Sequence, residues 1–262
     1  VPVMVELIKS SNRRSVLASF LHALFYVIYA VILLVLLVVF PTAPWAALAL
    51  VVVSKWRVVA VRPRYWWANI LSNLPDTLLG LGIVILMWSS ASLPIQIALT
   101  LGHIAWLVYL KPKHTRHMMM IQAGTSQFVA IWALFIVGHM LPEWIVVIMV
   151  FVIGFSSARH ALSTYDEADR GLLSLVWGFL VAQLGFVAWH WTIAYSISPT
   201  LKIPQIAIII SAIAMLAERG YAAWYDDGRI SWSEMKWPTI FVGLVLVILL
   251  MLFSGLWDAS TL

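Results

Sequence analysis

The chain has 262 residues, of which 63% are apolar and only 10% are charged, and its mean hydropathy is +0.98. Because soluble domains are about half apolar and about a quarter charged, this composition excludes an ordinary water-soluble domain. The net charge is +5 and there is no Cys, which excludes disulfides, thiolate metal sites and cysteine nucleophiles.

Nine apolar runs predict nine membrane-spanning helices, because about 20 residues of helix cross the hydrocarbon core. In chain order the runs are Ser15–Phe40, Pro44–Val61, Asp76–Leu93, Pro94–Leu110, Met118–Met140, Trp144–Leu162, Gly171–Ile197, Gln205–Trp224 and Trp237–Trp257. The first run is too long for the apolar part of a secretory signal, so we expect it to remain as a helix. We therefore predict an all-α transmembrane bundle that forms a single integral membrane domain over residues 1–262.

The basic residues predict the orientation of these helices. With the N-terminus placed inside, 15 of the 16 Lys and Arg residues fall on the inner side, and Lys202 is the exception. This is the positive-inside pattern of membrane proteins. We expect the N-terminus inside and Leu262 outside. The partner of the basic residues is then the anionic inner leaflet of the lipid bilayer and not nucleic acid.

Two inner segments are long enough to have structure of their own. Trp56–Pro75 and Tyr221–Lys236 both mix cationic with aromatic side chains, a combination that favours the headgroup layer. We expect both segments to lie along the inner membrane surface as anchors that set the depth of the helices.

The outer loops recur at intervals of about 50 residues, and this spacing predicts tandem helical hairpins. The hairpins are residues 15–64, 76–117, 118–170 and 171–236, followed by a final helix over 237–257. The best internal match sets Arg159 and the triplet Tyr165-Asp166-Glu167 against Arg219 and the triplet Tyr225-Asp226-Asp227. If the match is a duplication, the repeats are parallel, about an axis along the membrane normal.

Three stretches of this sequence carry a resemblance. They are SSARHALSTYDEADRGLLSLVWGF and AWHWTIAYS within residues 156–196, and the later MLAERGYAAWYDDG. The chain resembles an uncharacterised family of multi-pass membrane proteins from reduced-genome, candidate-phylum bacteria. The resemblance implies a bacterial inner-membrane location and brings no catalytic residue with it.

Familiar signatures of membrane enzymes and chromoproteins are missing. No Lys lies in the middle of an expected span, which excludes a retinal Schiff base, and neither G-x-S-x-G nor H-E-x-x-H occurs. We therefore predict no catalytic residue, and a protein that is not an enzyme is favoured over one that is.

Polar residues follow the helical period on several spans. One face of the first helix carries Ser15, Ser19, His22, Tyr26 and Tyr29. One face of the fourth carries Gln96, Thr100 and His103, and one face of the seventh carries Gln183 and His190. Lipid offers no hydrogen-bond partner, so these faces should point into the bundle. They predict either hydrogen bonds that hold helices together or a solute cavity lined by His22, Tyr26, Gln96, Thr100, His103, Gln127, Gln183 and His190. Haem b held by His103 with His22 or His190 is a weaker alternative.

Small residues predict close helix packing on the seventh and eighth spans. The small face of the seventh span consists of Gly171, Ser174, Gly178, Ala182 and Gly185. That of the eighth consists of Ala207, Ser211 and Ala214. Glu218 continues the second face toward a neighbouring helix. A buried carboxylate needs a cation or a proton, so we predict an Arg159–Glu218 ion pair, with proton coupling as the alternative.

The remaining acidic residues suggest turns and helix caps. Asp76 follows Pro75 and is expected to cap the third span. Enough oxygen ligands for Mg²⁺ or Ca²⁺ are present in the carboxylates of Asp166, Glu167, Asp169, Asp226 and Asp227. The Asp227-Gly228 turn signal and the Ser231/Glu234 capping box account for these residues more simply, and we predict no metal site.

Three functions are compatible with this sequence. The first is a small transporter, or a membrane protein that binds a solute or a lipid in a mid-membrane cavity. The second is a structural or assembly subunit whose polar residues only pack helices. The third is a membrane-embedded enzyme that acts on lipid at the inner acidic residues.

Overall fold

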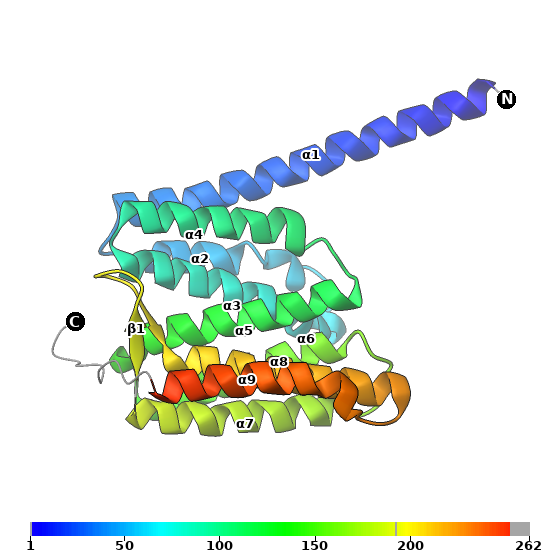
Figure 1. Ribbon diagram of the computed structural model, residues 1–262. Coiled ribbons are helices and arrows are strands. Elements are labelled where there is room, and N and C mark those ends of the chain that lie inside the picture. The colour runs from blue at the N-terminus through cyan, green and yellow to red at the C-terminus, as the bar shows by residue number, and fades with distance from the viewer. Residues whose placement is uncertain (1, 192, 252–262) are drawn as a thin grey trace.

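The computed structural model describes residues 2–191 and 193–251, and this part of the chain is almost entirely helical. The helices lie side by side in one bundle (Figure 1). They are α1 Pro2–Val39, α2 Trp45–Val53, α3 Trp66–Ser90, α4 Leu93–Ala105, α5 Arg116–Val137, α6 Glu143–Leu162, α7 Arg170–His190, α8 Gln205–Asp227 and α9 Trp232–Met251.

Eight of the helices in the described residues are long and apolar enough to cross a membrane. The exception among the nine expected spans is the second, because α2 has only 9 residues, or about 14 Å of helix. The expectation of a full second span is therefore wrong. Two short 3₁₀ turns follow α2, η1 at Trp56–Val58 and η2 at Pro63–Tyr65.

The expected seventh helix is also too long at its C-terminal end. α7 ends at His190, and the apolar residues beyond it form β1 (Ala194–Ser196), which pairs in antiparallel register with β2 (Lys202–Pro204). In this hairpin Tyr195 lies opposite Ile203. Pro199 disfavours continuation of the helix, and the chain instead turns back so that the two short strands pair.

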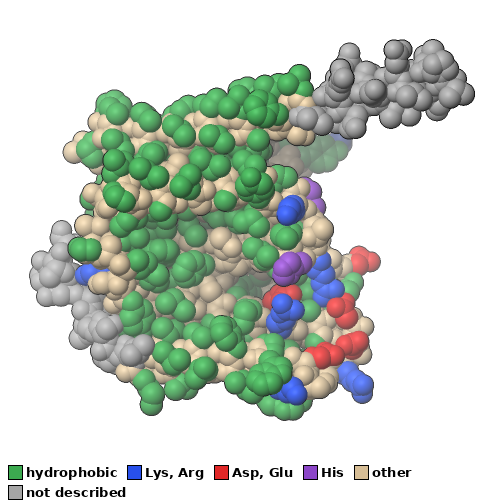
Figure 2. Space-filling model, turned by 45° about the horizontal axis from the view of Figure 1, so that its top comes forward, with side chains coloured by type: hydrophobic (Ala, Val, Ile, Leu, Met, Phe, Trp, Pro, Cys, Tyr) green, Lys and Arg blue, Asp and Glu red, His purple; other side chains and the backbone are tan. Residues whose placement is uncertain are grey.

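Charged side chains gather at one end of the bundle, and hydrophobic side chains cover the flank between the two ends (Figure 2). We call this end the charged end; α3, α5, α7 and α9 begin there, and α4, α6 and α8 end there. The β1–β2 hairpin with Lys202 lies at the other end (Figure 1), which we call the hairpin end. Phe179, Leu172 and Val176 of α7 are among many large apolar side chains that stay exposed. An apolar surface of this extent suits a lipid environment.

The two inner segments expected to lie along the membrane surface are shorter than predicted, because long helices take up part of each. α3 already begins at Trp66, inside the first of them. α8 continues to Asp227, and Gly228 then turns the chain with a φ of +69° before α9 begins at Trp232. In the first segment Trp56 to Tyr65 therefore form short 3₁₀ turns and the loop between them, whereas the aromatic residues of the second belong mostly to the ends of α8 and α9.

Glycines allow the closest helix contacts in the core. A Cβ on Gly82 of α3 would lie 3.0 Å from the backbone oxygen of Val129 on α5. A Cβ on Gly154 of α6 would lie 2.9 Å from Cβ of Val181 on α7. The predicted small face of α7 is confirmed at Ser174, Gly178, Ala182 and Gly185, which are all buried. At Gly171 the space is open.

Candidate functional site

The candidate site is built around Asp76, which lies inside α3. The expectation that Asp76 caps the third span is wrong, because α3 begins at Trp66 and continues through Pro75. Proline inside a helix removes one backbone donor and usually costs stability. Neighbouring helices in a packed bundle make that loss tolerable. Asp76 lies 14 residues before the last residue of the helix, Ser90 (90 − 76), and therefore about 21 Å from that end.

Two lysines and one tryptophan bind the Asp76 carboxylate. Lys111 Nζ lies 2.7 Å from Oδ2, Lys55 forms a second ion pair with the same oxygen, and Trp106 Nε1 donates a hydrogen bond to Oδ1 at 3.0 Å. The side chains of Asp76, Lys55 and Lys111 are only 13%, 18% and 30% exposed. We call Lys55, Asp76, Trp106 and Lys111 the lysine–aspartate cluster.

Irregular backbone brings these side chains to Asp76. α4 ends in a π-helical turn, η3 at Trp106–Leu110, in which the Lys111 amide donates to the Trp106 carbonyl at 2.8 Å. Single π-turns of this kind occur often at functional sites. Lys55 follows Ser54, the C-cap of the short helix α2, and a cation is favoured at the C-terminal end of a helix. An interrupted span and a π-turn therefore meet at one carboxylate.

The cluster has one more positive charge than it can neutralise. Two ammonium groups and one carboxylate sum to +1 (2 − 1). Burial lowers the pKa of Lys55, and attraction to Asp76 offsets this only in part. Burial also acts to lower the pKa of Lys111, but the Asp76 carboxylate outweighs it, so that pKa is raised. Both ammonium groups contact Asp76 Oδ2, so one carboxylate serves two cations, and Lys55 is the one whose charged form burial disfavours.

Aromatic rings and a buried histidine surround the cluster. Lys111 Nζ lies 5.3 Å from the centre of the Tyr26 ring, and the edge of Tyr29 meets His103 with ring centres 5.9 Å apart. His103 is only 2% exposed, and its Nδ1 has no hydrogen-bond partner among the described residues. Buried polar atoms rarely stay unpaired, so this atom is a candidate contact for a bound solute.

The predicted polar face of the fourth helix is buried, but two of its residues bond to protein atoms. Gln96 Nε2 donates to the Met87 carbonyl at 2.9 Å, and Thr100 Oγ1 donates to the Gln96 carbonyl at 2.8 Å. The first bond joins α4 to α3, and the second lies within α4. Gln127 of α5 is also buried; its Oε1 accepts a hydrogen bond from Trp177 at 3.0 Å, whereas its Nε2 has no partner among the described residues.

Three of the expected cavity residues lie outside the bundle. His22, Gln183 and His190 are all exposed, so the expectation that their faces point inward is wrong. On α7 the glycine and alanine face packs inward against α6, which leaves Gln183 on the outer side. His190 pairs with Glu143 at 3.4 Å at the hairpin end. The structure therefore does not bring His22 or His190 to His103 as a haem-ligand pair.

The expected Arg159–Glu218 ion pair does not form in the described part of the chain. Glu218 Oε2 instead lies 3.7 Å from Nε of Arg219 on its own helix, and its side chain is 25% exposed. The loop after α6 meets α8 through other residues. Tyr165 packs edge-on against both Tyr221 and Tyr225, with 4.9 Å between ring centres in each pair.

The two similar triplets meet at this tyrosine contact. Arg116 of α5 binds both carboxylate oxygens of Asp226 at 3.0 Å and donates to the Tyr165 hydroxyl at 2.9 Å. Glu167 accepts a hydrogen bond from Tyr221, which helps to lower the pKa of this carboxyl. The acidic residues thus join α5, α8 and the α6–α7 loop, and no group of three or more potential ligands among the described residues is placed to hold a metal ion.

The lysine–aspartate cluster was missed from the sequence. Its two cations come from Lys55 and Lys111, which are 56 residues apart in the sequence (111 − 55) and both reach the Asp76 carboxylate. One signal was present: Lys55 interrupts the expected second span, Pro44–Val61. A hydrophobic segment interrupted in this way is one pointer to a binding site in transporters, although the usual interruption is Gly or Pro.

Comparison of the chain with protein-family models, with curated proteins and with solved structures finds no match. The arguments about function below therefore rest on the residues and geometry of this chain.

Proposed function

We propose that the chain is a multi-pass protein of a bacterial inner membrane that binds and transports a small anionic solute. The observation that carries the proposal is the excess positive charge of the lysine–aspartate cluster. Ionisable groups inside a membrane bundle are costly and usually mark a solute or ion pathway. An anion that contacts Lys55 would neutralise the one positive charge that Asp76 leaves unbalanced.

The surrounding geometry supports this proposal. The interrupted span at α2 and the π-turn at η3 are irregular backbone at the place where the charges meet, as in transporters with broken helices. Buried His103 next to the cluster offers an unpaired ring nitrogen. The positive-inside pattern supports an inner position for this end of the bundle.

The test is anion binding by the purified protein in detergent, followed by uptake into proteoliposomes. Chloride, acetate and inorganic phosphate serve as probes, and the shift in thermal midpoint is the first readout. We expect at least one of these anions to stabilise the wild type and Lys113→Gln, a matched loss of one exposed lysine at the same end. Lys55→Gln should abolish the stabilisation and the uptake. Equal stabilisation of Lys55→Gln, or none of the wild type by any probe, contradicts the proposal.

A structural or assembly subunit is the second candidate. It is favoured by the hydrogen bonds that link helices through buried polar side chains. Gln122 is an example. Its Nε2 donates to the carbonyls of Leu110 at 2.6 Å and Lys113 at 2.9 Å. Its Oε1 lies 3.0 Å from Nε2 of His160. On this reading the cluster only packs α2, α3 and α4. Replacing all three of its charged residues by apolar ones would then preserve both fold and function.

A further inference from the structure

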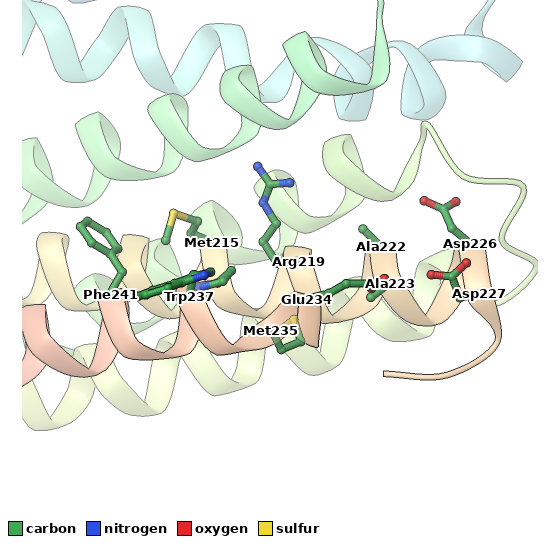
Figure 3. A pocket seen from close by; sticks show the side chains of 11 residues that line it. Met215, Arg219, Ala222, Ala223, Asp226, Asp227, Glu234, Met235, Trp237 and Phe241 are labelled. Carbon is green, nitrogen blue, oxygen red and sulfur yellow. The ribbon is translucent and has the colours of Figure 1, made fainter. Parts of the chain in front are cut away.

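A second site lies on the flank of the bundle, between α8 and α9 at the charged end. It is an open groove of about 610 Å³ that lies away from the lysine–aspartate cluster and shares no residue with it. Its lining changes in character along the helix axis (Figure 3). Phe241, Trp237 and Met215 lie at the membrane side, Arg219 lies in the middle, and Asp226 and Asp227 lie at the charged end.

The charged groups of this groove are available to a ligand. The Arg219 side chain is 57% exposed, and its one ion pair with a described residue is the 3.7 Å contact with Glu218. Asp226 is neutralised by Arg116. The carboxylates of Asp227 and of Glu234, which also lines the groove, form no ion pair or hydrogen bond with any described residue.

We propose that this groove binds one phospholipid whose phosphate is followed by a primary ammonium, the phosphatidylethanolamine class. The order of groups in such a lipid matches the order of the lining. The acyl chain would contact Met215, Trp237 and Phe241, the phosphate would meet Arg219, and the ammonium would meet Asp227 and Glu234. Guanidinium pairs well with phosphate, and an ammonium donates hydrogen bonds to carboxylates.

The two free carboxylates decide which headgroup fits. A lipid with a neutral headgroup and one phosphate charge, such as phosphatidylglycerol, offers them no cation. A trimethylammonium headgroup has the positive charge but no N–H to donate. The primary ammonium satisfies both requirements, and this selects phosphatidylethanolamine over the other two classes.

Native mass spectrometry of the full chain in detergent, with equal amounts of the three lipid classes, tests the proposal. We expect one phosphatidylethanolamine to be retained at least tenfold better than phosphatidylcholine or phosphatidylglycerol. Arg219→Gln should weaken its binding at least tenfold, and Arg219→Lys should weaken it less while keeping the headgroup preference. Arg229→Gln, the loss of an exposed arginine in the adjacent turn, should leave binding unchanged, as should Lys55→Gln at the other site.

The double variant Asp227→Asn/Glu234→Gln gives the sharpest outcome. It removes the partners of the ammonium and keeps Arg219, so phosphatidylglycerol should then bind as well as phosphatidylethanolamine. The proposal is overturned if the wild type binds the three lipids equally or binds none. It is also overturned if the double variant keeps the preference for phosphatidylethanolamine.

Discussion

Lys111 and Asp76 are 35 residues apart in the sequence (111 − 76), and their side chains meet with Nζ 2.7 Å from Oδ2. This contact joins the end of the π-turn η3 to the interior of α3, and Lys55 adds the end of α2 to the same carboxylate. Three chain segments therefore depend on a single negative charge. Removing that charge has a different consequence from removing either positive one.

Asp76→Asn should be among the most destabilising single changes in the chain. It leaves two partly buried ammonium groups without a counter-ion, and breaking a buried ion pair from one side costs about 3–5 kcal/mol. Reversible unfolding in mixed detergent micelles measures the loss. Asp169→Asn, at an exposed carboxylate before α7, is the matched control and should change stability by less than about 0.5 kcal/mol.

The combined variant Lys55→Met/Asp76→Leu/Lys111→Met separates the proposed roles of the cluster. Apolar replacement of a whole buried ion cluster is often neutral or stabilising. We expect this variant to be more stable than Asp76→Asn and to have lost anion uptake. Retained uptake would mean that the cluster only packs helices.

The stability of the protein should depend on pH through the two lysines. The pKa of Lys55 is lowered from about 10.5, so between its folded value and 10.5 the unfolded chain binds a proton that the folded chain lacks. Stability therefore rises with pH across this window. The pKa of Lys111 is raised, so its contribution is complete below 10.5 and is lost as pH rises through its folded value.

Thermal unfolding measured from pH 7 to pH 11.5 checks this expectation. The midpoint of the wild type should rise toward pH 10.5 and then fall. Lys55→Met should remove the rise and keep the fall, and Lys113→Gln should follow the wild type. A wild-type midpoint that falls steadily over the whole range would refute a lowered pKa of Lys55.

The sequence predicted the helical bundle well because apolar runs and small-residue faces are local signals. The helix starts at Arg170 and Gln205 lie within one residue of the expected ones. The prediction that Asp76 caps a helix failed because an aspartate after proline suits both a helix N-cap and a buried ion pair. Only the approach of Lys55 and Lys111, from segments far away in the chain, distinguishes the two. The prediction that Gln183 points into the bundle failed for a related reason. Packing of the glycine face against α6 decides how α7 is rotated about its axis.

Gly82→Ala should lower stability although it adds only one methyl group. Its Cβ would lie 3.0 Å from the Val129 backbone oxygen, which can move only if α3 and α5 separate. Overpacking of this kind costs about 1–3 kcal/mol. At Gly102 of α4 nothing lies within 4 Å of an added Cβ, so Gly102→Ala should be neutral or stabilising by up to about 1 kcal/mol. Equal effects at the two positions would contradict the close contact.

The membrane orientation can be tested with reporters. A reporter inserted in the segment from Lys111 to His117 should be inside, and one fused after Leu262 should be outside. Leu262 lies beyond the described residues, but the alternation of α3 to α9 between the two ends leaves Met251 at the hairpin end. α2 and the turns after it also return the chain from the hairpin end to the charged end. A Leu262 reporter on the inner side would show that one crossing is missing.

Cysteine labelling distinguishes a water-accessible path from dry packing beside the cluster, since the native chain has no Cys to react. If the cluster binds a solute that enters from the charged end, a water-soluble thiol reagent should modify His103→Cys. Gln183→Cys, on the outer side of α7, should stay unmodified because lipid surrounds it, and exposed Lys113→Cys should react fully. Inorganic anions that stabilise the wild type should slow modification at position 103 and leave position 113 unaffected. Silence at position 103 alongside full labelling at position 113 would favour the structural subunit, because His103 would then be sealed among Tyr29 and the residues of α4.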